Sequence, residues 1–223
     1  MKKDYDMVLL IFISYSEVVV ATLRGCVYKI DVGTGEAVWR LALEQPVFST
    51  PLLVAEARLV VATVTSALHL LNTATGLLVS SLATPGPVFG SPVRPGPGPA
   101  LCVGCQDGSV LRVTVRDTDL LDTVWRTQLG AGVAASPDVL DGGRVLAVCT
   151  TRGVLHLLGA ATGELLLSSS QLPGEIFSSP LVYRDSIVIG CRDNNLYCYQ
   201  LSQDDDERVV GNNDISAEHV AIP

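Results

Sequence analysis

The chain has 223 residues, of which 48% are hydrophobic and 17% charged, and its formal net charge is −8. The hydrophobic share argues against a disordered chain. The acidic balance argues against nucleic acid or an anionic membrane as partner, since both bind clustered Lys and Arg. The six cysteines have no spacing typical of a disulfide framework, which favours a reducing compartment, and we expect a cytoplasmic protein.

The first segment, residues 1–17, is the least regular part of the chain. A basic pair precedes the apolar run Met7–Ile13, as in a secretory signal, but Asp4 and Asp6 interrupt the basic region and no cleavage-site pattern follows. We therefore expect an irregular start or a first strand. Neither this run nor any other approaches the roughly 18 apolar residues of a transmembrane helix.

From residue 18 onward the sequence repeats. The clearest marker is an apolar pair, two small residues and a proline, and successive prolines are separated by 41, 45 and 43 residues. The four copies are VFSTP at 47–51, VFGSP at 88–92, VAASP at 133–137 and IFSSP at 176–180. A small residue before Thr or Cys, as in Ala21-Thr22, and a Thr-Gly pair, as in Thr34-Gly35, recur at the same period.

Each repeat consists of short apolar runs separated by Gly, Pro, Asn and Asp, which predicts antiparallel strands. No stretch has the 3.6-residue spacing of an amphipathic helix. Repeats of about 40–45 residues with four strands are typical of β-propeller blades. The predicted fold is therefore an all-β propeller of four-stranded antiparallel blades, with the first strand of each blade after the proline and the last after Thr-Gly.

The predicted blades span 18–43, 47–84, 88–130, 133–172 and 176–201. The last of them lacks a fourth strand, because the charged run from Gln203 to Arg208 breaks the pattern, and 202–223 is predicted to be an acidic disordered tail. About 4.5 blades indicate an incomplete ring. Its open end would leave an unpaired strand edge.

Cys102 and Cys105 have the spacing of a redox motif. In a strand, residues i and i+3 point to opposite faces, whereas a thioredoxin-like pair needs a helix N-terminus. We therefore interpret both as small buried strand residues. Cys191 holds the same repeat position as Cys105, which favours a structural role.

Two histidines, His69 and His156, also hold the same position in two repeats, 87 residues apart. They should lie two blades apart, so a shared metal site would need a third ligand near the axis of the propeller. The third histidine, His219, falls in the predicted tail. Similarly, Asp107 and Asp193 lie on equivalent turns, where Asx-turn hydrogen bonding explains them, as it does for the adjacent Asn194.

Asp31–Trp39 resembles the D-x-x-T-G-x-x-x-W signature of quinoprotein-type propeller repeats. Trp39 and Trp125 would either cap a quinone or dock one blade on the next with their large apolar area. Quinone dehydrogenases also need acidic and asparagine ligands for a calcium ion beside the quinone, and no such set is recognisable in the sequence.

One branch of these repeats is a closer match. GEIFSSPLVYRDSIVIGCRDNNLYCYQL, at 174–201, together with VFSTP and VFGSP, resembles the C-terminal propeller of the β-alanine-activating, acyl-CoA-synthetase-like enzyme family, over about 18–201. The resemblance implies a propeller that follows an ATP-dependent adenylation domain and a phosphopantetheine carrier domain. Neither a phosphate loop followed by Lys nor a carrier serine in a G-G-x-S motif is found in this chain.

We therefore predict no catalytic, cofactor-binding or metal-binding residues and no cofactor. The expected function is a non-catalytic scaffold that binds a protein partner or docks the upstream adenylation and carrier domains. The alternative is a fragment of a quinone-dependent dehydrogenase. A third interpretation, a bacterial-type assembly scaffold, would require a periplasmic signal or a lipoprotein cysteine near the start, and neither is visible.

Overall fold

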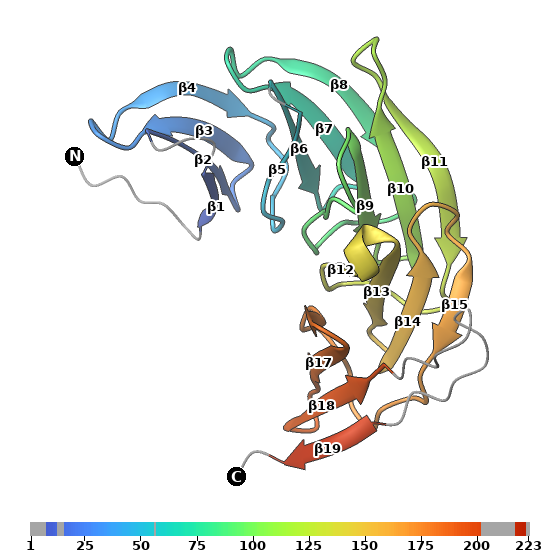
Figure 1. Cartoon of the computed structure of the whole chain (residues 1–223). Helices are drawn as coiled ribbons and strands as arrows, with labels where there is room; N and C mark the ends of the chain where they lie inside the picture. The colour runs from blue at the N-terminus through green and yellow to red at the C-terminus, as the bar shows by residue number, and fades with distance from the viewer. Residues whose placement is uncertain (1–7, 13–15, 56, 202–216, 222–223) are drawn as a thin grey trace.

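The computed structural model describes residues 8–12, 16–55, 57–201 and 217–221. Five antiparallel sheets follow one another along the chain and form an open arc of propeller blades (Figure 1). The predicted all-β propeller with an incomplete ring is thus confirmed. In the part of the chain described, the helical structure is a single 3-10 turn, Asp141–Gly143, and no helix there could span a membrane.

In each four-stranded blade the strands pair in chain order, so the first strand is innermost and the last lies on the outside of the arc (Figure 1). The first blade contains β1 (Val8–Phe12), β2 (Glu17–Thr22), β3 (Cys26–Asp31) and β4 (Ala37–Ala42). The second contains β5 (Leu52–Ala55), β6 (Arg58–Thr63), β7 (Ala67–Asn72) and β8 (Leu78–Ala83). The third contains β9 (Ala100–Gly104), β10 (Ser109–Val115) and β11 (Leu121–Gln128). The fourth contains β12 (Asp138–Leu140), β13 (Val145–Thr150), β14 (Val154–Gly159) and β15 (Leu165–Ser168). The fifth contains β16 (Leu181–Tyr183), β17 (Ser186–Gly190), β18 (Asn195–Gln200) and β19 (Ala217–Ala221).

The turns β2–β3, β6–β7, β9–β10, β13–β14 and β17–β18 share one backbone feature in all five blades. One position has φ between 65° and 90° in every copy, and it is occupied by Gly25, Ser66, Gly108, Gly153 and Asn194. Glycine takes this left-handed conformation without steric cost, and asparagine does so more easily than other residues. The repeat is therefore built on local turn chemistry as much as on strand pattern.

The hydrophobic core lies between the blades. Because side chains alternate across a sheet, an inner strand of a middle blade contributes to two clusters, as β6 does with Val60 and Val61, whereas an inner strand of an end blade contributes to one. In β17, for example, Ile187 and Ile189 are fully buried against the fourth blade, while Val188 between them points to the opposite face. Four such clusters follow one another along the arc, one at each junction of neighbouring blades.

The prediction for residues 202–223 is wrong at Ala217–Ala221, which form β19. This strand pairs antiparallel with β18, from Asn195↔Ala221 to Tyr199↔Ala217, and gives the fifth blade the fourth strand that the sequence was expected to lack. The outer edge of β18 is therefore paired, and the arc has five blades. The physical reason is that β18 presents unpaired backbone groups, which a strand distant in sequence can satisfy. The remaining residues of the predicted tail lie outside the described part.

Two further expectations concern first strands. Residues 8–12, inside the segment predicted to be an irregular start or a strand, form β1 and pair with β2. In the third blade, where a first strand was expected after Pro92, only a single bridge between Val93 and Cys102 is found. Pro95 and Pro97 follow immediately and have no N–H to donate, so the ladder cannot extend.

Candidate interaction face along the arc

Four connections between blades lie on one face of the arc, against the turns between second and third strands. They span 43–51, 84–92, 129–137 and 169–180. Backbone hydrogen bonds join the two sets: Gln106 N–H donates to Pro87 O at 2.8 Å, and Arg192 N–H donates to Glu175 O at 3.0 Å. We call this face the rim. It consists of the four connections and the turns that they contact.

The apolar pair in each connection divides its two side chains between core and solvent. The first member is fully buried in every copy; these residues are Val47, Val88, Val133 and Ile176. The second member is exposed where it is aromatic, by 40% at Phe48, 37% at Phe89 and 48% at Phe177. The rings of Phe48 and Phe89 meet edge to face, with centroids 5.7 Å apart. Exposed aromatic rings on a fixed backbone are the kind of anchor that protein interfaces use.

The connections are fixed to one another by a relay of hydrogen bonds. Thr50 N–H donates to Ser91 Oγ at 2.8 Å, Ser91 N–H donates to Ser136 Oγ at 2.7 Å, and Ser136 N–H donates to Ser179 Oγ at 3.1 Å. All four residues precede the proline of their repeat, so each bond joins equivalent positions of consecutive blades. The relay gives the rim a rigid backbone, which keeps its exposed side chains in place.

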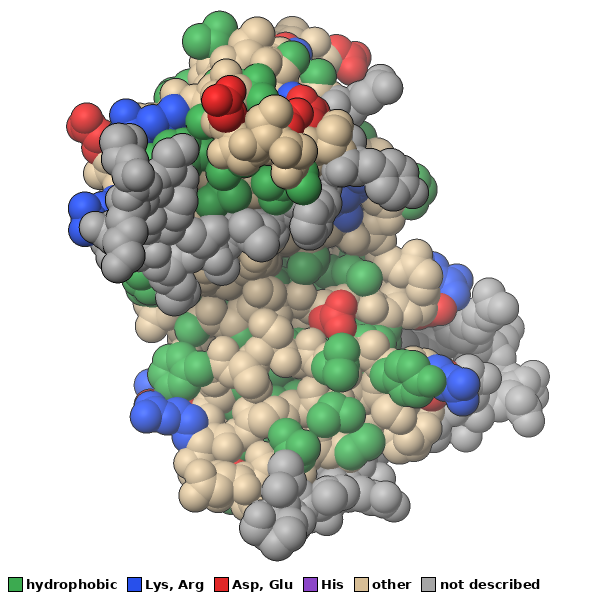
Figure 2. Space-filling view, turned by 90° about the vertical axis from the view of Figure 1, so that its left-hand side faces the viewer, with side chains coloured by type: hydrophobic (Ala, Val, Ile, Leu, Met, Phe, Trp, Pro, Cys, Tyr) green, Lys and Arg blue, Asp and Glu red, His purple; other side chains and the backbone are tan. Residues whose placement is uncertain are grey.

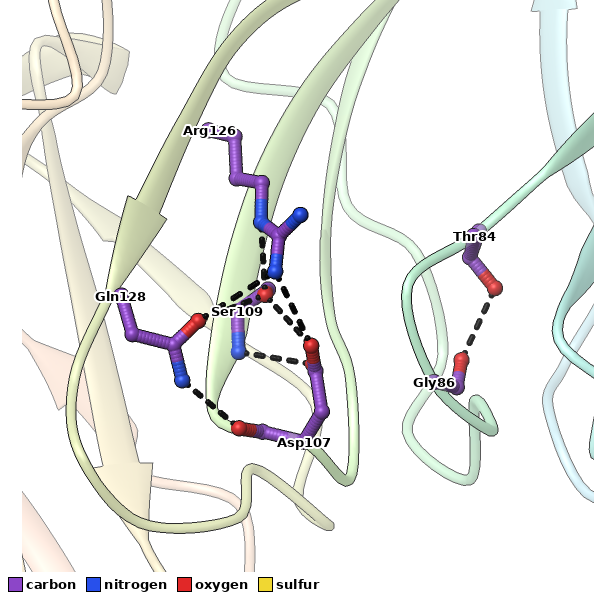
Figure 3. Close-up of polar contacts among 6 residues, drawn as sticks. All are labelled: Thr84, Gly86, Asp107, Ser109, Arg126 and Gln128. Carbon is purple, nitrogen blue, oxygen red and sulfur yellow. Dashed lines mark hydrogen bonds and ion pairs between the residues drawn. The ribbon is translucent and has the colours of Figure 1, made fainter.

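The turn of the third blade contains the densest polar cluster on the rim (Figure 3). Ser109 Oγ accepts from Arg126 Nε and lies 2.9 Å from both Asp107 Oδ2 and Gln128 Oε1. Arg126 also approaches Asp107 Oδ2 at 3.2 Å, and Gln128 Nε2 donates to Asp107 O at 2.7 Å. The hydroxyl and the carboxylate are thus engaged in holding the turn. This arrangement has no free base that could activate Ser109 as a nucleophile.

The two aspartates predicted to form Asx turns do so. Asp107 Oδ1 accepts from Ser109 N–H at 3.0 Å, and Asp193 Oδ1 accepts from Asn195 N–H at 3.1 Å. Tyr197 OH donates to Asp193 Oδ2 at 2.6 Å, and this bond is the main cause that lowers the pKa of Asp193 to about 2. Asn194 holds the left-handed position of the same turn. These residues stabilise the rim turns.

The placement predicted for the cysteines is confirmed. Cys102 belongs to the cluster between the third and fourth blades and Cys105 to the cluster between the second and third, so they face opposite ways. Burial raises the pKa of the Cys102 thiol to about 12 and that of Cys105 to about 11. A thiol with such a pKa is a poor nucleophile at neutral pH.

The repeat-equivalent histidines make the same contact in their two blades. His69 Nδ1 lies 2.8 Å from Ser81 Oγ, and His156 Nδ1 lies 2.8 Å from Ser168 Oγ. Burial lowers the pKa of both rings, to about 4 at His156. Within the residues that the structure describes, no group of three or more His, Cys, Asp or Glu is placed to hold a metal ion.

Of the two roles considered for the tryptophans, the structure shows the docking of blades. Trp39 Nε1 donates to Thr73 O of the second blade at 2.9 Å, and Trp125 Nε1 donates to Ala160 O of the fourth at 3.2 Å. Each indole lies on the glycine of the next blade's Thr-Gly pair, Gly76 or Gly163. One face of each ring is therefore covered by protein.

Sequence reasoning missed the rim. It used the apolar pair and the residue before proline only as markers of the period, although their side chains form the exposed aromatic positions and the hydrogen-bond relay. The available signal was an aromatic residue at the second position of three pairs, Phe48, Phe89 and Phe177, each beside a β-branched residue. One of two adjacent large apolar side chains in a short connection must face solvent.

Comparison with known proteins identifies one family. A family model described as "Beta-alanine-activating enzyme, beta-propeller" matches residues 8–201. Proteins named beta-alanine-activating enzyme are 32% identical over 115 residues in Danio rerio, 40% over 82 residues in Mus musculus and 28% over 197 residues in Drosophila melanogaster. These matches cover 49%, 34% and 81% of this chain but only 10%, 7% and 19% of the relatives, so the chain corresponds to a small part of their length.

Solved structures agree on the fold. BamB from Moraxella catarrhalis superimposes with a TM-score of 0.71 at 16% identity, covering 90% of this chain and 62% of that one. The Cps50 (Swd1) β-propeller domain from Myceliophteria thermophila gives a TM-score of 0.69 at 13% identity, covering 98% and 72%. At these identities the likeness shows the propeller fold alone.

Proposed function

The chain belongs to the β-propeller family of the β-alanine-activating enzyme, and on that premise we propose that it is a non-catalytic docking scaffold whose rim binds a protein domain. The observation that carries the proposal is the set of exposed aromatic side chains at equivalent rim positions, Phe48, Phe89 and Phe177. A propeller supplies a rigid framework, and binding residues then reside in its connections and turns.

The partner we propose is the phosphopantetheine carrier domain of a longer β-alanine-activating enzyme, with the adenylation domain beside it. Three arginines support this choice, because the rim turns of the first, fourth and fifth blades expose Arg24, Arg152 and Arg192. Arg192 lies over the Phe177 ring, 5.4 Å from its centroid, and forms an exposed ion pair with Glu175 of the neighbouring connection at 2.9 Å, which an acidic partner would have to displace. A chain with a net charge of −8 thus presents cationic and aromatic groups together on the rim. That pairing suits an acidic surface or the phosphodiester of a carrier arm.

In this proposal the ligase chemistry of the longer relatives takes place on their other domains, in the cytoplasm, and the propeller positions the carrier. The test is an NMR titration of the isotopically labelled chain with the carrier domain of such a relative, with and without its phosphopantetheine arm. Shifts confined to the amides of residues 47–50, 88–91 and 176–179 would support docking at the rim. No shift at a millimolar carrier concentration, or shifts confined to the opposite face around Leu77 and Leu120, would refute it.

A further inference from the structure

The junctions between blades contain a contact that is built twice in the same way. At the first junction, a Cβ on Gly76 would lie 2.5 Å from the Trp39 ring, and at the third, a Cβ on Gly163 would lie 2.6 Å from the Trp125 ring. Both glycines have positive φ, 72° and 74°. Only a residue without a side chain fits beneath the indole, so each turn is a platform for the tryptophan of the preceding blade.

The first blade contains the same platform without a tryptophan on it. Gly35 has φ 70°, and its N–H donates to Asp31 O at 2.8 Å, as Gly76 N–H does to Asn72 O at the same distance. A Cβ on Gly35 would have no atom within 4 Å. Val32 holds the position of Thr73, whose carbonyl receives the Trp39 indole, and it is 49% exposed.

The turn around Gly35 is held in shape by its own side chains. Asp31 Oδ1 accepts from Thr34 N–H at 2.8 Å and from Thr34 Oγ1 at 3.0 Å. Behind the turn, Val18, Val20 and Ile30 have the positions that Leu146, Val148 and Leu158 use against the third blade. Val18 and Val20 are buried, whereas Ile30 is partly exposed and residues 32–36 of the turn are exposed.

We propose that residues 31–36 of the first blade are a docking site for the tryptophan of a further blade, supplied by the longer polypeptide of this family. That blade would place its indole on Gly35 and donate its N–H to Val32 O. The solved propellers contain residues beyond the arc, since this chain covers 62% and 72% of them. This inference does not depend on what binds the rim.

The fifth blade is open on the opposite side, toward where a next blade would lie. Tyr183 and Val54 each lie three residues after the proline of their repeat. Tyr183 is 63% exposed, whereas Val54 packs against the third blade and is 1% exposed. Leu181 beside it is 61% exposed. Figure 2 looks into the open side of the arc and shows hydrophobic side chains gathered in its lower part, at the height of the fifth blade in Figure 1.

A second copy of the chain fits the first-blade platform less well. In the first blade, Trp39 of β4 pairs with Lys29 of β3. The residue equivalent to Lys29 in the fifth blade is Cys198, and it pairs with Glu218 of β19, so Glu218 has the register position of a tryptophan. A head-to-tail neighbour would therefore have position 218 of β19, which is not a tryptophan, at the register position that Trp39 holds in β4. The occupant consistent with the platform is a blade that carries tryptophan on its outermost strand.

The test adds such a blade to the full chain. A copy of residues 88–130, which contains Trp125, is placed directly before Met1. Nine residues then separate the copied β11 from β1, the same number as in the connections 43–51 and 129–137. Gly35→Ala is introduced into the extended and the original chain, and the midpoint of urea unfolding is measured in both. The matched control is the extended chain with the copied tryptophan changed to serine.

In the extended chain, Gly35→Ala should lower the midpoint about as much as Gly163→Ala does, because the alanine then meets the copied indole. In the original chain and in the serine control, Gly35→Ala should cause only the smaller shift of backbone strain. An equal shift in all three chains would overturn the proposal. This is also the result expected if the added blade does not dock on the first blade. Self-association of the original chain that Gly35→Leu abolishes would also overturn it, because the occupant would be a second copy.

Discussion

The indole of Trp125 lies on Gly163 of the following blade, where a Cβ would approach the ring to 2.6 Å, and its N–H donates to Ala160 O at 3.2 Å. A tryptophan at one blade and a glycine at the next are therefore a matched pair. The Trp and the Gly that meet come from consecutive repeats, so a single repeat signature contains only one partner of each contact.

The junction between the second and third blades shows what replaces the pair. Ser80 stands at the tryptophan position, and Asp119 stands at the left-handed position with φ 61°. Ser80 Oγ donates to Asp119 O at 2.8 Å, and Arg58 forms a bidentate ion pair with the Asp119 carboxylate. Both members have changed together, and polar contacts take the place of the stacked indole.

We expect Gly163→Ala and Gly76→Ala to destabilise the chain strongly. Each adds the cost of a left-handed alanine, about 1–2 kcal/mol, to that of an overpacked contact with the indole, about 1–3 kcal/mol. Gly35→Ala is the matched control, because it has the same backbone but no neighbour within 4 Å. Urea unfolding measures the difference. Equal losses at all three glycines would contradict the stacking.

The stability of the chain should fall as the pH drops from about 6.5 toward 4. Burial lowers the pKa of His156 to about 4 in the folded state, while the unfolded chain keeps a value near 6.5. The unfolded state then binds the proton more readily, so stabilisation that is complete above about pH 6.5 is lost at lower pH. His156→Gln should flatten the dependence of the unfolding free energy on pH. An unchanged slope would contradict this assignment.

The thiols should separate into two classes. Cys26 and Cys198 are partly exposed, whereas the other four are buried, and burial raises the pKa of Cys149 to about 12. In native protein at pH 8, a thiol reagent should label the two partly exposed cysteines first and the rest only after urea is added. Cys198→Ser should remove one fast-reacting thiol. Fast labelling of Cys149 in folded protein would be incompatible with its burial.

Ser136→Ala should cost about 1 kcal/mol of stability, since it removes the hydroxyl that accepts from Ser91 N–H at 2.7 Å. Ser170→Ala, at an exposed position outside the relay, is the control and should be nearly neutral. Urea unfolding of both variants checks the relay. If the two substitutions behave alike, the relay contributes little to the rim.

Much of the fold was predictable because the same sequence pattern recurs in each repeat, so several copies indicate the same local structure. The period, the strand order and the buried cysteines all follow from local patterns. β19 could not be found this way, because it lacks the Thr-Gly marker and is separated from β18 by a charged run. In the third blade, the missing first strand depends on Pro95 and Pro97, whose effect on the ladder outweighed the repeat pattern.

The candidate site was less predictable than the fold. The Trp39 contact was one of two options from the sequence, and its glycine partner could be assigned only when consecutive blades were seen together. The exposure of Phe48 and the bond from Thr50 to Ser91 depend on how two connections, 41 residues apart in sequence, lie side by side. Such neighbours are set by the curvature of the arc, which no local pattern specifies.

The affinity of the carrier domain for rim variants tests the proposed docking most directly. A chain with Phe48→Ala and Phe89→Ala should bind at least about tenfold more weakly, as expected when central aromatic anchors are removed. Its unfolding midpoint should stay near that of the original, because both side chains are exposed. The Leu77 side chain is 66% exposed on the opposite face, and the Leu77→Ala variant should bind as the original does. Unchanged affinity in the double variant would contradict a docking role for the rim, and weaker binding by Leu77→Ala would place the contact on the opposite face.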